Sequence, residues 1–166
     1  MITYQGSHSP NEPIGYSDAS FAADPDDRKS TSGYVFILAN GPISWQSNKQ
    51  STVALSTMEA EYIALSEAAK EAKFLRHLTS TINKPIVGPT IIKTDSQAAL
   101  EHVKNNIRHA RTKHIDTRHH FIRNVYTSGE IDLRHVSSES QAADILTKPL
   151  GYIKHTDGIR LLHLAN

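Results

Sequence analysis

The stretch "TSGYVFILANGPISWQSNKQ", Thr31–Gln50, contains two apolar runs separated by Asn40-Gly41-Pro42. Asn-Gly between two such runs is a strong signal for a β-hairpin, because these residues tolerate the positive φ angles of a tight turn. The preceding run, "PIGYSDASFA", carries aromatic and small residues that suit a strand. We therefore expect three strands at the start, at least the last two of them antiparallel, and we place Trp45 in the core.

Downstream of the hairpin, predicted helices and strands alternate. Ser56 followed three residues later by Glu59 is the capping-box pattern, so we expect a helix from about Thr57 to Thr81. The β-branched run Thr90–Thr94 predicts a buried strand. The other expected elements are helices opening near 96 and covering 112–126, a strand at 130–136, and a helix at 137–148 that Pro149 stops.

This order predicts a single α/β domain, in which helices pack on the faces of a mixed sheet. The length of 166 residues fits one domain. We expect the domain to cover residues 14–150, with 1–13 as a lead-in segment and 151–166 as a C-terminal tail whose "IRLLHLA" run is compatible with a helix.

Composition narrows the functional classes. The chain has no cysteine, which excludes disulfides and thiolate metal sites. No apolar run reaches membrane-spanning length, and the N-terminus shows no signal-peptide pattern, so we expect a protein that is not secreted. Net charge is +1, yet residues 104–123 carry six basic side chains and one acidic one. This basic segment is either a footprint for a polyanion or a solvated helix face.

Four carboxylates mark candidate chemistry: Asp18, Glu61, Asp95 and Asp144. Asp18 interrupts the first predicted strand, Asp95 closes the fourth, Glu61 lies in the first turns of the long helix, and Asp144 lies in the last one. If the first and fourth strands are neighbours, Asp18 and Asp95 meet at one edge of the sheet. Singly, each acid also has an ordinary explanation, such as a bulge, a helix cap or a surface charge.

The phase of the long helix separates its two glutamates. At 100° per residue, Glu61 falls inside the apolar stripe that contains Met58, Leu65 and Ala69. Glu59 falls on the opposite, polar side, together with Ser66, Lys70 and Lys73. We therefore expect Glu59 to cap the helix and Glu61 to point at the sheet.

An inward carboxylate among apolar residues is costly unless it is protonated, hydrogen-bonded or bound to a cation. Converging carboxylates also repel one another, and a divalent ion resolves that conflict. Oxygen ligands without cysteine suit Mg²⁺ or Mn²⁺. Two such ions form the clamp used in phosphodiester hydrolysis. The residues alone thus point to a metal-dependent phosphoryl-transfer site.

Six blocks of the sequence resemble the ribonuclease H domain of copia-type long-terminal-repeat retrotransposons. They are "GYSDASFAADPDDRKSTSGYVF", "ISWQSNKQ", "LSTMEAEYIAL", "IKTDSQAAL", "RTKHIDTRHHFIR" and "QAADILTKPL", and together they span Gly15 to Leu150. The resemblance implies a ribonuclease H fold with a five-stranded mixed sheet of order 3-2-1-4-5. It also implies hydrolysis of the RNA strand of an RNA–DNA hybrid during reverse transcription.

The family's site residues carry over onto matching positions of this chain. Asp18 and Asp95 are expected to contact both of two Mg²⁺ ions, for which Mn²⁺ is an alternative. Glu61 is expected to hold the ion near the leaving group, and Asp144 the ion that activates water. His135 is the nearest candidate for the loop histidine of cellular relatives, but its place at a strand end favours a structural role.

The resemblance further implies a hybrid substrate, a reverse transcriptase domain in the same polyprotein as partner, a monomer in isolation, and a cytoplasmic retrotransposon particle. The candidate nucleic-acid contacts are Ser20, Lys49, Gln97, Arg111, Lys113 and Arg118. Two alternatives stay open. One is a catalytically idle nucleic-acid-binding module that assists a reverse transcriptase. The other is a zinc site among the five histidines from His102 to His120, although His114 and His119 are five apart and no acid completes the set.

Overall fold

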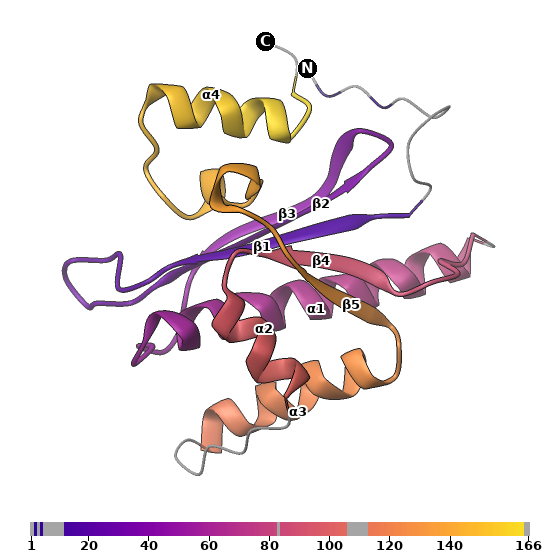
Figure 1. Ribbon diagram of the computed structural model, residues 1–166. Coiled ribbons are helices and arrows are strands. Elements are labelled where there is room, and N and C mark those ends of the chain that lie inside the picture. The colour runs from indigo at the N-terminus through magenta and orange to yellow at the C-terminus, as the bar shows by residue number, and fades with distance from the viewer. Residues whose placement is uncertain (1, 3, 5–11, 83, 106–112, 165–166) are drawn as a thin grey trace.

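The computed structural model describes residues 2, 4, 12–82, 84–105 and 113–164. Its centre is one five-stranded mixed sheet of order β3-β2-β1-β4-β5, as predicted (Figure 1). The strands are β1 (Ile14–Ser20), β2 (Thr31–Leu38), β3 (Gly41–Lys49), β4 (Thr90–Thr94) and β5 (Ile131–His135). β1 pairs antiparallel with β2 and parallel with β4, so the C-terminal ends of β1 and β4 lie at the same edge of the sheet.

The predicted β2–β3 hairpin is confirmed, but its turn lies one residue earlier than Asn40-Gly41. Leu38 pairs with Gly41, and the two connecting residues, Ala39 and Asn40, have φ angles of 51° and 62°. Two positive φ angles in a two-residue loop match the right-handed twist of the flanking strands. Gly41 is therefore already the first residue of β3.

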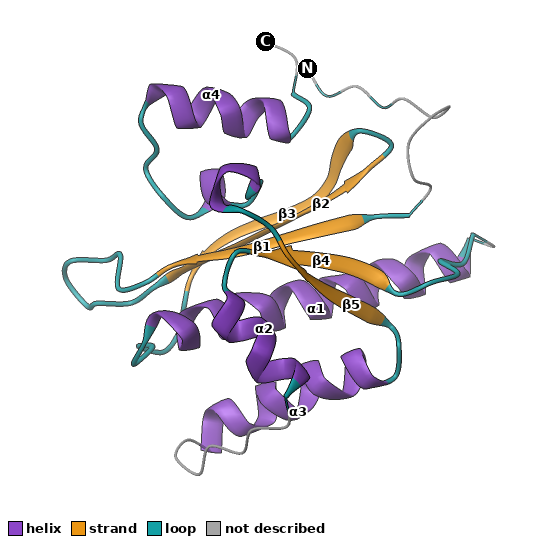
Figure 2. Cartoon of the chain, in the orientation of Figure 1, coloured by secondary structure: helices purple, strands orange, loops and turns teal. Residues whose placement is uncertain are grey.

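Helices cover both faces of the sheet (Figures 1 and 2). On one face lie α1 (Thr57–Thr81), α2 (Gln97–Lys104) and α3 (Lys113–Thr127), and α4 (Tyr152–Leu161) lies on the other. The strand alternation matches this division: Tyr34 and Phe36 join the core under α1, and Val35 faces α4. Among the described helices, none has the length and apolar character that a bilayer crossing requires.

The helix predicted at 137–148 is wrong. The segment forms two short 3₁₀ helices, η1 (Ser138–Ser140) and η2 (Asp144–Leu146). Gln141 between them is buried, and its amide nitrogen donates to the Ser17 carbonyl at 3.0 Å while its oxygen accepts the Ala143 N–H at 3.3 Å. These bonds fix the segment to β1 and compete with a continuous helical ladder.

Two expectations about burial are also wrong. Trp45 is 56% exposed because β3 is an edge strand, and the elements that cover its neighbour Val35 do not cover Trp45. Ser66, expected on the polar side of α1, is fully buried. α3 packs against α1 near this side, where the Tyr62 and His119 rings have centroids 4.0 Å apart. Because a second helix packs there, the exposed residues on this side of α1 begin only at Lys70.

Candidate metal centre

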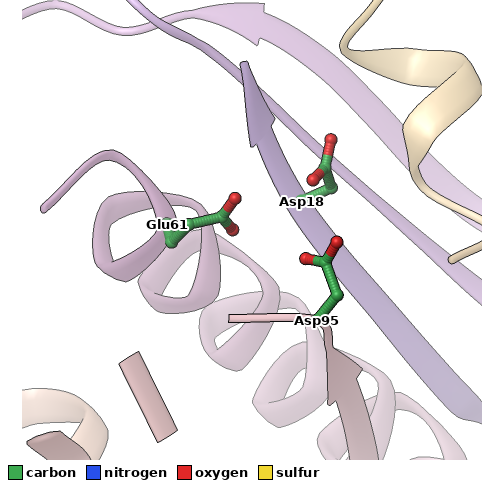
Figure 3. A group of neighbouring side chains, drawn as sticks. All are labelled: Asp18, Glu61 and Asp95. Carbon is green, nitrogen blue, oxygen red and sulfur yellow. The ribbon is translucent and has the colours of Figure 1, made fainter. Parts of the chain in front are cut away.

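Three carboxylates from three elements converge at one edge of the sheet (Figure 3). Asp18 comes from β1, Asp95 directly follows β4, and Glu61 projects from the second turn of α1. Each offers one ligand oxygen, and these oxygens all lie within 4.8 Å of one another. The convergence that the sequence predicted for these three acids is therefore present.

Glu61 is held in an environment that disfavours its charge. The residue is 5% exposed, and its Oε2 atom has no hydrogen-bond partner among the described residues. Burial raises the pKa of Glu61 to about 9, and the neighbouring charges of Asp18 and Asp95 add to this rise. Without a cation, the carboxyl group is therefore protonated at neutral pH.

Glu59, two residues earlier, has the separate role predicted from the helix phase. Its carboxylate accepts the Leu55 N–H at 2.9 Å, and its own N–H donates to the Ser56 hydroxyl at 3.1 Å. Ser56 is the N-cap of α1. The pair closes the first turn of the helix, as a capping box does, and Glu59 takes no part in the carboxylate cluster.

Asp18 is fully buried and has two partners from the segment after η2. Its Oδ2 accepts the Thr147 hydroxyl, and its Oδ1 lies 3.1 Å from the Lys148 ammonium. Burial raises the pKa of Asp18, and these two partners act against the rise. Gly33, the residue of β2 that pairs with Asp18, makes room for this segment, because a Cβ there would lie 2.7 Å from Thr147 Cγ2.

Asp144 stands outside the three-acid cluster and reaches it through Lys148. The Lys148 ammonium lies 2.9 Å from Asp144 Oδ1 and so bridges this carboxylate to Asp18. Burial alone would lower the pKa of Lys148, but its bonds to Asp144 and Asp18 outweigh that cost and raise the pKa. Asp144, the fourth predicted acid, therefore lies next to the three-acid cluster, and Lys148 is the counter-charge between them.

Sequence reasoning missed three residues of this site: Ser138, Thr147 and Lys148. The Ser138 hydroxyl donates to Asp95 Oδ2 at 2.8 Å. Thr147 and Lys148 lie where the sequence predicts the last turn of a helix before Pro149, a position that indicates no role in the site. The available signal was a lysine four residues after Asp144, since that spacing places an ammonium beside a carboxylate on one helical turn.

The predicted nucleic-acid contacts divide by location. Ser20 lines a pocket of about 380 Å³ beside Glu61 and Asp95. Lys49 lies at the same end of the sheet, because Ser20 pairs with Thr31 and Thr31 with Lys49. The Lys49 ammonium is held by Asp24 at 2.6 Å and Asp27 at 2.9 Å.

Gln97 opens α2 directly after the cluster, and its amide donates to Glu101 at 3.1 Å. His135 is exposed at the end of β5, beside Thr94, and thus also lies at the cluster's edge of the sheet. Arg118 is half-buried on α3, next to His119, whose ring packs against Tyr62 of α1. Lys113 begins α3, but its side chain lies outside the described residues, as does Arg111.

The zinc alternative receives limited support. The Nε2 atoms of His102 and His119 lie 3.0 Å apart, and the side chain of His114 is outside the described residues. Over the part of the chain that is described, the acidic cluster is the one group with three or more candidate metal ligands. Its oxygen ligands, two of them from buried residues, and the unsatisfied Glu61 Oε2 fit a hard divalent cation.

Comparison with known proteins gives a consistent picture. The chain is 44% identical over 140 residues to the retrovirus-related Pol polyprotein from transposon TNT 1-94 of Nicotiana tabacum. It is 42% identical over 135 residues to that from transposon RE1 of Arabidopsis thaliana, and 32% over 142 residues to the Transposon Ty1-DR1 Gag-Pol polyprotein of Saccharomyces cerevisiae. These alignments cover 83%, 81% and 84% of this chain but only 10%, 9% and 8% of the polyproteins. No protein-family model matches the sequence.

Two solved structures illustrate the fold. LC11-RNase H1 in complex with RNA/DNA hybrid superposes with a TM-score of 0.59 at 17% identity, covering 82% of this chain and 94% of that one. The foamy viral protease-reverse transcriptase in complex with RNA/DNA hybrid gives 0.61 at 18% identity, covering 94% and 22%. At such identities the likeness shows the fold, which is that of ribonuclease H.

Proposed function

Since this chain is the homologue of a segment of copia-type retrotransposon Pol polyproteins and has a ribonuclease H fold, we propose that it is a metal-dependent endonuclease. Its proposed reaction is hydrolysis of the RNA strand of RNA–DNA hybrids during reverse transcription. The observation that carries the proposal is the cluster of Asp18, Glu61 and Asp95, whose ligand oxygens lie within 4.8 Å of one another.

The proposed cofactor is a pair of Mg²⁺ ions, or Mn²⁺ in their place, held by Asp18, Glu61, Asp95 and Asp144. When bound, these ions supply an activated water and neutralise the charge on the attacking and leaving oxygens. Asp18, on the central strand of the sheet, and Asp95, directly after the neighbouring strand, would fix the position of the ions. Glu61 supplies a carboxylate only once it is ionised, so cation binding releases its proton.

The choice of RNA over DNA requires contacts to 2′-hydroxyl groups across a wide, shallow minor groove. Ser20 and Gln97 flank the acids and are the proposed groups for this contact. Lys49 lies farther along the same sheet end and is proposed to approach a phosphate after leaving Asp24 and Asp27. Two of the structural neighbours were solved with an RNA/DNA hybrid, which supports this substrate class.

The chain spans about a tenth of the polyproteins that it matches, so its wider setting is part of the proposal. We propose that a reverse transcriptase domain in the same polyprotein is its partner. The proposed location of the hydrolysis is a cytoplasmic retrotransposon particle. The proposed oligomeric state of the isolated domain is a monomer.

The deciding experiment is incubation of the purified protein with an end-labelled RNA–DNA hybrid and Mg²⁺, with RNA–RNA and DNA–DNA duplexes as controls. We expect cleavage of the RNA strand alone, with 5′-phosphate products and full inhibition by a chelator. Asp95→Asn is the matched variant because Asp95 is only half-buried. It is expected to lose more than about 100-fold in rate, since even changes to residues that only hydrogen-bond to a metal ligand cost about 10–100-fold. A wild type that binds the hybrid without cutting it would indicate the idle binding module instead.

A further inference from the structure

Lys148 places a positive charge inside the carboxylate site. Its ammonium lies 3.1 Å from Asp18 Oδ1 and 2.9 Å from Asp144 Oδ1. Asp18 is fully buried and the Asp144 side chain is 17% exposed, so both carboxylates depend on a nearby counter-charge. Between Asp18 and Asp144, the ammonium therefore supplies the positive charge that a metal ion would otherwise supply.

The chain holds this ammonium in place from both sides. Lys148 follows Asp144 by four residues, and its own N–H donates to the Asp144 carbonyl at 3.1 Å. Thr147, its neighbour, donates to the second oxygen of Asp18. The backbone of the segment is thus anchored, and only the flexible side chain of Lys148, which is 34% exposed, has room to move.

On the other side of the site, the described residues form no ion pair with Glu61 or Asp95, because the contacts of the Lys148 ammonium are with Asp18 and Asp144. Glu61 and Asp95 form the cluster with Asp18, and the lining of the adjacent pocket includes Lys148 as its single basic residue among those described. Glu61 has an oxygen without a hydrogen-bond partner in the described part of the chain. A divalent cation therefore meets an unpaired oxygen at Glu61 and a half-buried carboxylate at Asp95. On the Asp144 side, both carboxylates, Asp18 and Asp144, already hold the Lys148 ammonium, which the cation must displace.

We propose that Lys148 is a built-in competitor for the second of the two metal ions. In the free protein it keeps the Asp18–Asp144 side closed, so that one divalent cation binds readily and a second binds poorly. A substrate phosphate offers the displaced ammonium a new partner, because Lys148 lies at the wall of the same pocket. Lys148 thereby couples binding of the second cation to the presence of nucleic acid. This inference rests on the proposed metal-dependent function.

The test is a Mn²⁺ titration of metal-free protein, followed by electron paramagnetic resonance and calorimetry without any nucleic acid. Wild type is expected to bind one Mn²⁺ tightly. Lys148→Met is expected to bind two, the second at least about ten-fold more tightly than in wild type, because a repelling charge has been removed. Lys148→Arg keeps the charge and should behave as wild type. Lys73→Met, which breaks an exposed ion pair with Glu130, is the matched control and should also leave the titration unchanged.

A second measurement uses wild type alone and does not depend on how well a variant folds. Saturating Mn²⁺ is expected to raise the acylation of Lys148 by an amine-reactive reagent several-fold, with Lys73 unchanged, as read by mass spectrometry. Identical titrations of wild type and Lys148→Met, or acylation of Lys148 that does not respond to Mn²⁺, would overturn the inference while leaving the nuclease proposal intact. Absence of saturable Mn²⁺ binding in every variant would overturn both.

Discussion

Replacing Glu61 by glutamine converts the carboxyl group that the structure buries into a neutral group of the same shape. The pKa of Glu61 is raised from its ordinary value of 4.5 to about 9, first by burial and then by Asp18 and Asp95. Between these two pH values the unfolded chain has lost this proton and the folded, metal-free chain still holds it. The free energy of unfolding of wild type therefore falls with rising pH over this window.

The size of the effect follows from the width of the window. Each pH unit between the two pKa values costs about 1.4 kcal/mol, so the full shift corresponds to an upper limit of about 6 kcal/mol. Glu61→Gln has no such proton to lose. We expect it to match wild type near pH 4.5 in the absence of metal, and to become progressively more stable than wild type up to pH 9.

Urea unfolding in the presence of a chelator, at a series of pH values from 5 to 9, measures this difference. Glu59→Gln supplies the baseline, because it only weakens the contact to the Leu55 N–H and costs at most about 1 kcal/mol. Added Mg²⁺ should then stabilise wild type and leave Glu61→Gln nearly unaffected. A stability difference between Glu61→Gln and wild type that stays constant across this pH range would refute the account of Glu61 given above.

Two further substitutions probe the supports of the site. Gly33→Ala adds a Cβ that would lie 2.7 Å from the Thr147 side chain, so we expect a loss of about 1–3 kcal/mol in thermal unfolding and weaker cleavage. Gly151→Ala has open space at its Cβ and should be neutral; equal melting temperatures for the two variants would contradict the packing described for Gly33. Trp45 is the single tryptophan, so its exposure predicts a red-shifted emission that acrylamide quenches, and Trp45→Ala should change stability by less than about 0.5 kcal/mol. Blue-shifted emission that acrylamide does not quench would instead show that Trp45 is buried, which would contradict its exposure in the structure.

The sequence was sufficient where a local pattern decides the outcome. The strand Thr90–Thr94 and the helix Thr57–Thr81 have the bounds expected from their periodicity and caps. The inward direction of Glu61 followed from the helix phase, because a rotation of 100° per residue is the same in any helix. Strand order came from the family resemblance, and the structure agrees with it.

The sequence was insufficient where the outcome depends on what packs against an element. Trp45 is exposed because β3 is an edge strand and the elements that cover Val35 do not reach it. The burial of Ser66 depends on a second layer of helix packed on α1. Lys148 looks like an ordinary surface lysine until β1 brings Asp18 beside it. No local pattern predicts a contact between residues so far apart in the chain.

The bonds from Asp18 to Thr147 and Lys148 join residues that are 129 and 130 positions apart. During translation the N-terminal strands leave the ribosome first. β1 is therefore synthesised well before its parallel neighbour β4 and before the two residues that bind its buried carboxylate. A nascent chain that ends before Thr147 has an unmatched acid in the middle of its sheet. The order of synthesis thus delays the pairing of Asp18 with Thr147 and Lys148 until almost the whole domain has emerged.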